Sequence, residues 1–384
     1  MKDNRREFIK KGTSLAAALS VGAMGVSAAT VNNSAITDAL AKKDVTWPVT
    51  EGPDTPKMSM NVGLNDPALK VKAIKQFGAD YIHLSGPKLP WTVEGIQTIV
   101  DRYKAEGLTI INMMVNFSGD IIHAGPTRDE EIKKVQDALR IAGKVGIPIV
   151  EYNFYAHRLT EGYYNVEGRG GSGYLGYDYN RVNPRFGMAA KDLPPTEQDP
   201  AMTKEQLWAN ITYFLKAVIP VAEQSNVRMA LHPNDPPPPI SRGSEQIMST
   251  FKDWKHLFDI VDSPSNGMTF DCGVSTEIGE NAVEVLRYMA SRNRINHVHY
   301  RNVIVETPSI KYVEVFPDNG QVNMFAIMQE LVKHKYKFGV FAEHPRGNAV
   351  DKERGGDFIS YLYNQAYARA MLQAALTLEQ GYKG

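Results

Sequence analysis

Short apolar runs alternate with longer segments of helical period from Met58 almost to the C-terminus, and this alternation restricts the fold more than any other feature of the chain. Runs that alternate in this way are typical of βαβ units, in which helices join parallel strands. Eight units with no break in composition fit a closed barrel better than an open sheet with a second domain. We therefore expect one (β/α)8 TIM barrel over residues 55–384.

The predicted strands are apolar runs bounded by turn residues. They are Met58–Val62, Tyr81–Leu84, Thr109–Val115, Ile147–Phe154, Val227–His232, Met268–Asp271, Ile295–Val303 and Phe338–Glu343. Helix starts are marked by Asp66 as a cap before Pro67, and by capping boxes at Thr127 with Glu130 and at Thr203 with Gln206. Further helices are predicted over Thr92–Glu106, Gly279–Ser291, Asn323–His334 and Asp357–Glu379.

The first residues predict export. The pair Arg5-Arg6 precedes a modest apolar run, 14–23, and a small-residue cleavage pattern, Val26-Ser27-Ala28. This arrangement resembles a twin-arginine signal, which a receptor reads. We expect a signal peptide over 1–29, a linker over 30–54, the export machinery as a partner and a periplasmic location. The alternative is a basic start before an amphipathic helix. The apolar run is too short to span a bilayer, so no stable membrane span is expected in the mature form.

Charge and cysteine content exclude some functions. Lysine plus arginine number 43, as do aspartate plus glutamate, so nothing in the bulk charge attracts nucleic acid or an anionic membrane. Cys272 is the one cysteine, and the chain therefore has no internal disulfide from which its compartment could be read.

The connection after the fourth predicted strand, Tyr155–Met202, is unusually long for a compact domain. It contains a glycine-rich run, 168–173, and five tyrosines: Tyr163, Tyr164, Tyr174, Tyr177 and Tyr179. Long loops of this kind are often lids or binding loops, and aromatic rings could stack on a sugar. The alternative is a self-packed excursion or a contact between copies of the chain, which leaves a homo-oligomer open.

Four consecutive predicted strands carry a potential metal ligand at the carboxyl end, where barrel enzymes place their chemistry. The set is His232, Asp271, His299 and Glu343. Two imidazoles and two carboxylates suit Mn²⁺, Fe²⁺, Co²⁺ or Zn²⁺, and the hardness of the oxygen donors favours manganese. Cys272 is the competing ligand on the sixth strand; because successive side chains face opposite ways, only one of the two neighbours can bind. Asp271 is favoured.

Residues near these ligands are candidates for catalysis and substrate binding. His344, beside Glu343, could transfer a proton near neutral pH. Arg301 offers a fork for a substrate carboxylate, although an ordinary salt bridge is the alternative. The polyproline run 235–240 is expected to shape one wall. The predicted substrate-binding residues are Asn153, Arg158, Asn302, Arg242 and Arg346.

Several motifs together resemble the mannonate dehydratase family of the xylose-isomerase-like barrels. The segment 149–154 is similar to the fourth strand of that family. His232-Pro233-Asn234-Asp235-Pro236-Pro237 is similar to its HPDDPP segment, His299-Tyr300-Arg301-Asn302 to its HLRN strand, and Glu343-His344 stands where the family has Asp-His. The resemblance implies a bound divalent metal and dehydration of an aldonic acid to a 2-keto-3-deoxy acid.

The chain also departs from the family pattern. The family has Cys where this chain has Asp271 and Asp where it has Glu343. In a later family segment, a histidine and two aspartates are replaced by Pro317, Gln321 and Asn323. Related sugar epimerases and isomerases share the Asp, His and Glu ligands but have Glu in place of His232.

Three functions follow from these observations. The leading prediction is a metal-dependent lyase that removes water from a sugar acid or an oxidised sugar derivative. The second is a sugar isomerase or epimerase on the same metal site. The third is an exported sugar-binding barrel without catalysis, against which the intact ligand set and His344 argue.

Overall fold

The computed structural model describes Val49 and residues 51–381. The predicted signal peptide, 1–29, and most of the predicted linker, 30–54, lie outside the described residues, so both remain predictions. Within the described part of the chain, no helix combines the length and the apolar character that crossing a membrane requires.

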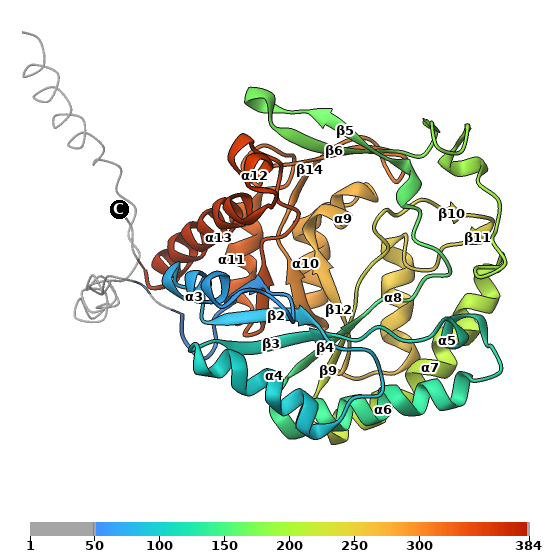
Figure 1. The fold of residues 1–384 in the computed structure, drawn as a ribbon, viewed down its shortest axis with the longest axis horizontal. Helices are drawn as coiled ribbons and strands as arrows, with labels where there is room; N and C mark the ends of the chain where they lie inside the picture. The colour runs from blue at the N-terminus through green and yellow to red at the C-terminus, as the bar shows by residue number, and fades with distance from the viewer. Residues whose placement is uncertain (1–48, 50, 382–384) are drawn as a thin grey trace, which may run out of the picture. The chain divides into compact units, whose positions relative to one another are not determined.

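Eight parallel strands close into a barrel in the order β1-β16-β13-β12-β9-β4-β3-β2 (Figure 1). The first and last strands pair directly, with Lys57 opposite Gly339, and this pairing closes the sheet. The strands are β1 (Lys57–Asn61), β2 (Tyr81–Ser85), β3 (Thr109–Met114), β4 (Ile149–Tyr152), β9 (Arg228–Leu231), β12 (Asn266–Asp271), β13 (Ile295–His299) and β16 (Gly339–Phe341). The predicted single (β/α)8 barrel is confirmed.

Helices follow the strands and bury an apolar stripe against the barrel. In α6, Val135, Leu139 and Ala142 are buried, at the three- and four-residue spacing of one helix face. The α-helices are α3 (Ala68–Gln76), α4 (Val93–Ala105), α5 (Gly119–His123), α6 (Arg128–Val145), α7 (Lys204–Gln224), α8 (Phe251–Ile260), α9 (Cys272–Glu277), α10 (Ala282–Ser291), α11 (Met324–Lys333), α12 (Ala349–Arg354) and α13 (Phe358–Glu379).

Only one of the three predicted helix caps forms as expected. Thr203 caps α7 in a complete capping box, as predicted. The box at Thr127 was wrong, because its hydroxyl bonds to Asp120 and makes no cap bond to α6. The cap at Asp66 was also wrong, since its carboxylate turns back to accept from the backbone N–H of Gly63 at 2.7 Å.

The predicted seventh strand, Ile295–Val303, merges two separate elements. The barrel strand β13 ends at His299, and a new strand, β14 (Asn302–Thr307), forms an antiparallel hairpin with β15 (Lys311–Val315). The backbone leaves the barrel at this point, which brings Arg301 among buried carboxylates. The predicted fourth strand, Ile147–Phe154, was likewise too long, since β4 covers four residues.

The long connection 155–202 contains four of the structure's strands. Its β5 (Tyr163–Glu167) and β6 (Gly173–Asp178) join the hairpin β14–β15 in a four-stranded antiparallel sheet, β14-β15-β6-β5, which we call the lid sheet. Figure 1 shows β5, β6 and β14 together outside the ring of barrel strands. Two further short hairpins are β7–β8 (Val182–Asn183 and Met188–Ala189) and β10–β11 (Ile240–Ser241 and Ser244–Glu245).

Tyrosines of this connection build a small core of their own. Tyr177 and Tyr312 stack with ring centroids 5.2 Å apart, and Tyr179 and Leu159 pack in the same cluster. The Tyr163 hydroxyl donates to Asp235 at 2.8 Å, which ties the lid sheet to the segment after β9. This cluster fits the self-packed alternative for the connection. Tyr163 and Tyr164 are only partly buried, and the roles as a lid and in stacking on a sugar stay predictions.

Candidate metal centre

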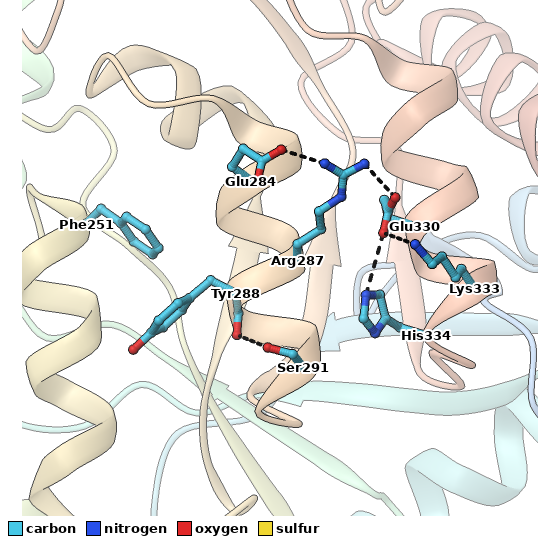
Figure 2. Close-up of a pocket in the computed structure, with 8 residues that line it drawn as sticks. All are labelled: Phe251, Glu284, Arg287, Tyr288, Ser291, Glu330, Lys333 and His334. Carbon is cyan, nitrogen blue, oxygen red and sulfur yellow. Dashed lines mark hydrogen bonds and ion pairs between the residues drawn. The ribbon is translucent and has the colours of Figure 1, made fainter.

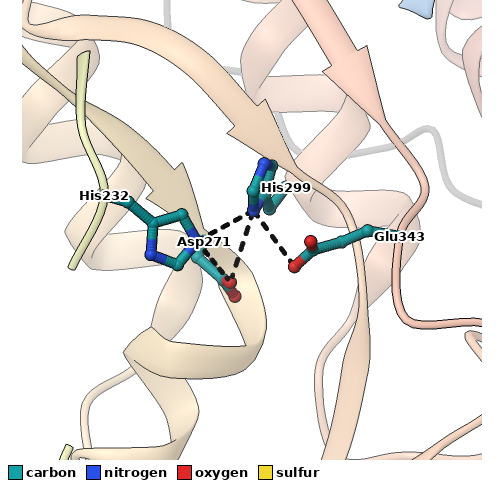
Figure 3. A group of neighbouring side chains, drawn as sticks. All are labelled: His232, Asp271, His299 and Glu343. Carbon is teal, nitrogen blue, oxygen red and sulfur yellow. Dashed lines mark hydrogen bonds and ion pairs between the residues drawn. The ribbon is translucent and has the colours of Figure 1, made fainter. Parts of the chain in front are cut away.

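The four predicted ligands meet at the carboxyl ends of β9, β12, β13 and β16. Asp271 and His299 end neighbouring strands and lie opposite each other in the parallel register. His232 follows β9, and Glu343 follows β16. One potential donor atom from each residue lies within 4.8 Å of the other three. Figure 3 shows the four side chains pointing toward one another.

Hydrogen bonds fix which atoms face the shared point. His232 Nδ1 lies 2.6 Å from the Pro233 carbonyl, which accepts its proton and leaves Nε2 as the free nitrogen. His232 Nε2 lies 3.0 Å from His299 Nδ1 and 3.8 Å from Asp271 Oδ2. His299 Nδ1 also lies 3.1 Å from Glu343 Oε1. Two imidazole nitrogens and two carboxylate oxygens therefore converge.

This donor set fits a divalent cation. Glu343 Oε1 is buried, and no described residue gives it a well-directed hydrogen bond. His299 Nδ1 at 3.1 Å and Arg301 Nε at 3.2 Å approach this oxygen without hydrogen-bond geometry. A cation between the two facing ring nitrogens and this carboxylate oxygen would satisfy all three. Three of the four side chains are buried, and His232 is partly buried. The residues are those that a hard or borderline divalent metal takes in proteins.

Burial and neighbouring charges set the protonation of the centre. Burial alone would lower the pKa of His299, but the carboxylates of Glu343 and Glu151 outweigh burial and raise it to about 9. Burial raises the pKa of Asp271, against the pull of the Arg301 guanidinium. A cation would replace the proton on His299 as the positive charge between these carboxylates.

Arg301 is buried among carboxylates beneath the centre. Its Nε donates to Asp271 Oδ2 at 3.0 Å, and its Nη1 donates to Glu277 Oε1 at 2.6 Å. Its Nη2 lies 3.4 Å from Asp235 Oδ2. Nε and Nη1 are thus engaged by hydrogen bonds while Nη2 makes an ion pair alone, and Arg301 holds the ligand Asp271 in place. The salt-bridge alternative thus describes its position better than a fork for a substrate carboxylate.

His344 stands at the edge of the centre in a strained conformation. Its φ is 48°, in the left-handed region that side chains other than glycine rarely adopt. Nδ1 lies 2.8 Å from Glu314 Oε2, while Nε2 lies 3.6 Å from Glu343 Oε2. Burial would lower the pKa of His344, but Glu314 and Glu343 outweigh it, and the pKa lies above its ordinary value. Nε2 is thus placed to carry a proton near the metal centre.

A cavity of about 140 Å³ opens onto the metal centre. Its lining combines ligands of the centre with polar and apolar side chains from the ends of β3 and β4 and the segment after β9. The lining residues are Met114, Asn153, Tyr155, Arg158, His232, Pro233, Asp235, His299, Glu343 and His344. The structure therefore brings the predicted residues Asn153 and Arg158 to the cavity beside His344.

Two other predicted substrate-binding residues, Arg242 and Asn302, have partners elsewhere in the described chain. Arg242 donates to Glu161 Oε1 at 2.6 Å. Asn302 donates to the carbonyl oxygens of Pro317 and Val322, which orders the turn after the lid hairpin. These contacts account for both side chains, so we leave them out of the proposed substrate-binding set.

Arg346 also contacts protein rather than the cavity. Its Nη2 lies 2.8 Å from Glu314 Oε2, and its Nε donates to the His344 carbonyl at 2.9 Å. Arg346 therefore fixes the loop that carries His344, and we leave it out of the substrate-binding set as well.

Cys272 faces away from the centre, as strand alternation predicted. Its Sγ lies 3.1 Å from the Arg301 carbonyl and 3.4 Å from the His299 carbonyl, and burial raises the pKa of the thiol. A buried protonated thiol directed at backbone carbonyls is a poor metal ligand. Asp271 is the residue of the pair that reaches the metal centre.

Several residues of the site escaped the sequence-based prediction. Glu151, Glu277 and Glu314 are buried carboxylates that contact residues of the centre or His344, and Tyr155 and Met114 line the cavity. Tyr155 lies just after the predicted strand Ile147–Phe154, which was a usable signal, whereas Glu151 lies inside that predicted strand and near the end of the shorter observed β4. Glu314 lies on a lid strand and Glu277 on a helix, where no local pattern points to the centre.

A larger groove lies elsewhere on the surface, beside α10 and α11 (Figure 2). Its polar side chains pair mainly with one another: Arg287 joins Glu284 and Glu330, and Glu330 also faces His334. These pairs lie on helices outside the barrel strands. Among the described residues, none of the potential metal-binding groups lies in this groove.

Comparison with known proteins identifies a family. A family model described as "D-mannonate dehydratase (UxuA)" matches residues 57–377. The mannonate dehydratase of Enterococcus faecalis is 31% identical over 332 residues, which cover 73% of this chain and 89% of that protein. The mannonate dehydratase of Streptococcus equi subsp. zooepidemicus is 31% identical over 278 residues, covering 67% and 75% respectively.

Solved structures share the fold. The crystal structure of mannonate dehydratase from Streptococcus suis serotype 2 matches with a TM-score of 0.76 at 24% identity, over 84% of this chain and 96% of that chain. An L-ribulose 3-epimerase matches with a TM-score of 0.53 at 11% identity, over 86% of this chain and 100% of that chain. At these identities the likeness extends to the barrel alone.

Proposed function

This chain belongs to the mannonate dehydratase family, and we propose on that premise that it is a divalent-metal-dependent lyase that removes water from an aldonic acid or a close oxidised derivative. The observation that carries the proposal is the convergence of His232, Asp271, His299 and Glu343 beside His344. Family membership supports a sugar-acid dehydratase, and the geometry supplies the residues that such a reaction needs.

The reaction breaks one C–H and one C–O bond. The C2 proton and the C3 hydroxyl leave as water, and the resulting enol rearranges to a 2-keto-3-deoxy acid. When bound, a divalent cation supplies Lewis acidity that makes the proton beside the carboxylate easier to remove. His344 would give the proton on Nε2 to the departing hydroxyl. The C2 proton would pass to solvent, from which Nε2 regains a proton, so that one water is lost overall.

Binding of the substrate falls to the other side chains of the cavity. Arg158 Nε donates to the Asp235 carbonyl at 2.5 Å, and Nη2 lies 3.5 Å from Asp235 Oδ2. The side chain is still 43% exposed, so the remaining N–H groups of the guanidinium can face a substrate carboxylate. Asn153 offers an amide whose one described contact is a weak one, to the Met114 sulfur at 4.0 Å. The segment after β9 forms part of the cavity wall through Pro233 and Asp235.

We propose Mn²⁺ as the metal. Two carboxylates and two imidazoles form a harder set than one with a thiolate, and Asp271 stands where the resembling family has cysteine. The proposal therefore favours manganese over zinc.

The test is a substrate panel with the metal-loaded protein. Purified full chain with Mn²⁺ is mixed with aldonates, uronates and keto-sugars, and 2-keto-3-deoxy products are detected after derivatisation. Formation of such a product from an aldonate supports the lyase. Solvent deuterium incorporated at a sugar carbon without loss of water would establish an epimerase instead, and bound Mn²⁺ with no turnover of any sugar would establish a binding protein.

We also propose export to the periplasm through the twin-arginine machinery. The support is the sequence of residues 1–29 alone. Replacement of Arg5 and Arg6 by lysine should retain the protein in the cytoplasm, measured by cell fractionation. Unchanged export of that variant would refute the proposal. Chromatography with light scattering would settle whether the exported protein forms a homo-oligomer.

A further inference from the structure

His299 has two ring nitrogens, and the structure directs them at different partners. Nδ1 faces His232, Asp271 and Glu343 in the metal centre. Nε2 points the other way, into the barrel, where it lies 3.6 Å from Glu151 Oε1. The nitrogen that keeps the ring proton decides which nitrogen can bind a metal.

Glu151 is held firmly beside Nε2 of His299, at an ion-pair distance from this nitrogen. Asn112 donates to its Oε2 at 2.7 Å, and Thr269 donates to its Oε1 at 2.7 Å. Both partners come from other barrel strands, β3 and β12, so the carboxylate is fixed from two sides. Glu151 is 2% exposed, and among the described residues its ion-pair partner is His299.

We propose that Glu151 is a positioning residue: it keeps the ring proton of His299 on Nε2 and so presents Nδ1 to the metal centre. The proposal rests on the metal centre of the proposed function and gives Glu151 a specific role there. A buried carboxylate behind a metal-binding histidine is a general device for fixing the tautomer and the ring orientation of the ligand.

His297, two residues before His299 on β13, cannot fix the tautomer of His299 in place of Glu151. The His297 and His299 rings lie with centroids 5.1 Å apart, but neither nitrogen of His297 has a hydrogen-bond partner among the described residues. Burial holds the pKa of His297 well below its ordinary value, so the ring is neutral. Glu151, His297 and His299 are close enough to hold a cation of their own. Both oxygens of Glu151 already accept hydrogen bonds, which favours the positioning role over a second ion.

The first test is metal affinity in the full chain. Mn²⁺ binding is measured by competition with a chromophoric chelator for the native protein, Glu151→Gln and Glu330→Gln. In Glu151→Gln the new side chain can turn its amide nitrogen toward His299 and favour the wrong tautomer, so the affinity should fall about 10- to 100-fold. Glu330, a buried carboxylate in the groove of Figure 2, is the matched control, and Glu330→Gln should bind as the native protein does.

A second measurement reports the tautomer itself. In protein labelled with ¹⁵N-histidine and loaded with diamagnetic Zn²⁺, the native chain should show His299 metal-bound at Nδ1 and protonated at Nε2. Thr269→Val, which loosens Glu151 without removing its charge, should weaken Mn²⁺ binding less than Glu151→Gln does.

Two results would overturn the proposal. One is a folded Glu151→Gln protein with Mn²⁺ affinity within twofold of native and an unchanged His299 tautomer. The other is a second bound Zn²⁺ per native chain that Glu151→Gln abolishes, because Glu151 would then be a ligand. If the native chain binds Mn²⁺ but dehydrates no aldonate, the proposed function is wrong, whereas the inferred role of Glu151 is unaffected.

Discussion

Nδ1 of His344 lies 2.8 Å from Oε2 of Glu314, a residue of the lid sheet. The same oxygen lies 2.8 Å from Nη2 of Arg346. Burial would raise the pKa of Glu314, but His344 and Arg346 outweigh it and hold the pKa below its usual value. A charged carboxylate from the lid therefore orients the histidine whose other nitrogen faces the metal centre.

The first prediction concerns that pair. His344→Ala should lower kcat by about 100-fold or more, the range that general acid–base groups contribute, while Mn²⁺ binding is retained. Glu314→Gln should lower kcat less, because it disturbs the orientation of His344 but leaves the imidazole. Activity and metal content are measured together. His334→Ala, which alters a partly exposed histidine at the end of α11, is the control; loss of metal from His344→Ala would make His344 a ligand instead.

The second prediction separates the two neighbours that competed for the metal. Asp271→Asn should weaken Mn²⁺ binding by at least about 100-fold, since outer partners of a metal alone contribute about 10- to 100-fold. Asparagine can still accept the N-cap bond from Val274 that Asp271 accepts at 2.8 Å, so α9 should stay folded. Cys272→Ser should bind Mn²⁺ as the native protein does. The reverse order of affinities would assign the metal to the thiol.

The third prediction concerns Arg158. Arg158→Met should raise KM for an aldonate by about tenfold or more, because a charge-assisted hydrogen bond contributes about 1.5–3 kcal/mol. Its effect on a neutral keto-sugar of the same length should be small. Arg140→Met, which removes an exposed arginine on α6, controls for the loss of a positive charge. Equal losses on both substrates would show that Arg158 shapes the cavity without binding the carboxylate.

The fourth prediction concerns stability and pH. Asp351 accepts from the backbone N–H groups of Ile359 at 3.0 Å and Ser360 at 2.8 Å, at the start of α13. Burial would raise the pKa of Asp351, but these bonds outweigh it and lower the pKa. A carboxylate with a lowered folded-state pKa stabilises the fold above its unfolded pKa of about 3.9, and the stabilisation is lost as the pH falls further.

Asp351→Asn should therefore cost about 2 kcal/mol of unfolding free energy at pH 7, with the difference from native shrinking below about pH 4. Urea unfolding at both pH values measures it. Asp357→Asn, which removes a charge from the same helix start where no side-chain cap bond is made, should have little effect at either pH. A pH-independent difference would assign the role of Asp351 to packing.

Sequence periodicity was sufficient to predict the barrel. Each βα unit is a continuous stretch of chain, and its apolar run and amphipathic helix each have a recognisable pattern. The four ligands could be predicted equally well, because a closed parallel barrel brings the carboxyl ends of its strands to one rim. His232, Asp271, His299 and Glu343 could thus be grouped before any distance was known. The alternation rule also placed Cys272 on the opposite face from Asp271.

The lid and the outer contacts of the site could not be predicted in this way. The lid sheet pairs β6 with β15, and this pairing depends on contacts between distant parts of the chain. Arg242, Asn302 and Arg346 were predicted to bind substrate but contact other described residues, because the sequence does not show whether a polar side chain faces a substrate or a buried protein group. For Arg301, the salt-bridge alternative fits its contacts. Glu314 was not predicted at all, because it reaches His344 only through the position of the lid strand β15 on which it lies.

The lid sheet is assembled from two segments, 163–178 and 302–315, that emerge from different corners of the barrel. Transplanting either segment alone into a relative would leave β6 or β15 without its hydrogen-bonding mate, and Tyr177 without Tyr312. Moving the lid sheet into another barrel therefore requires both segments as a pair, together with Asp235, which accepts hydrogen bonds from Tyr163 and Tyr312.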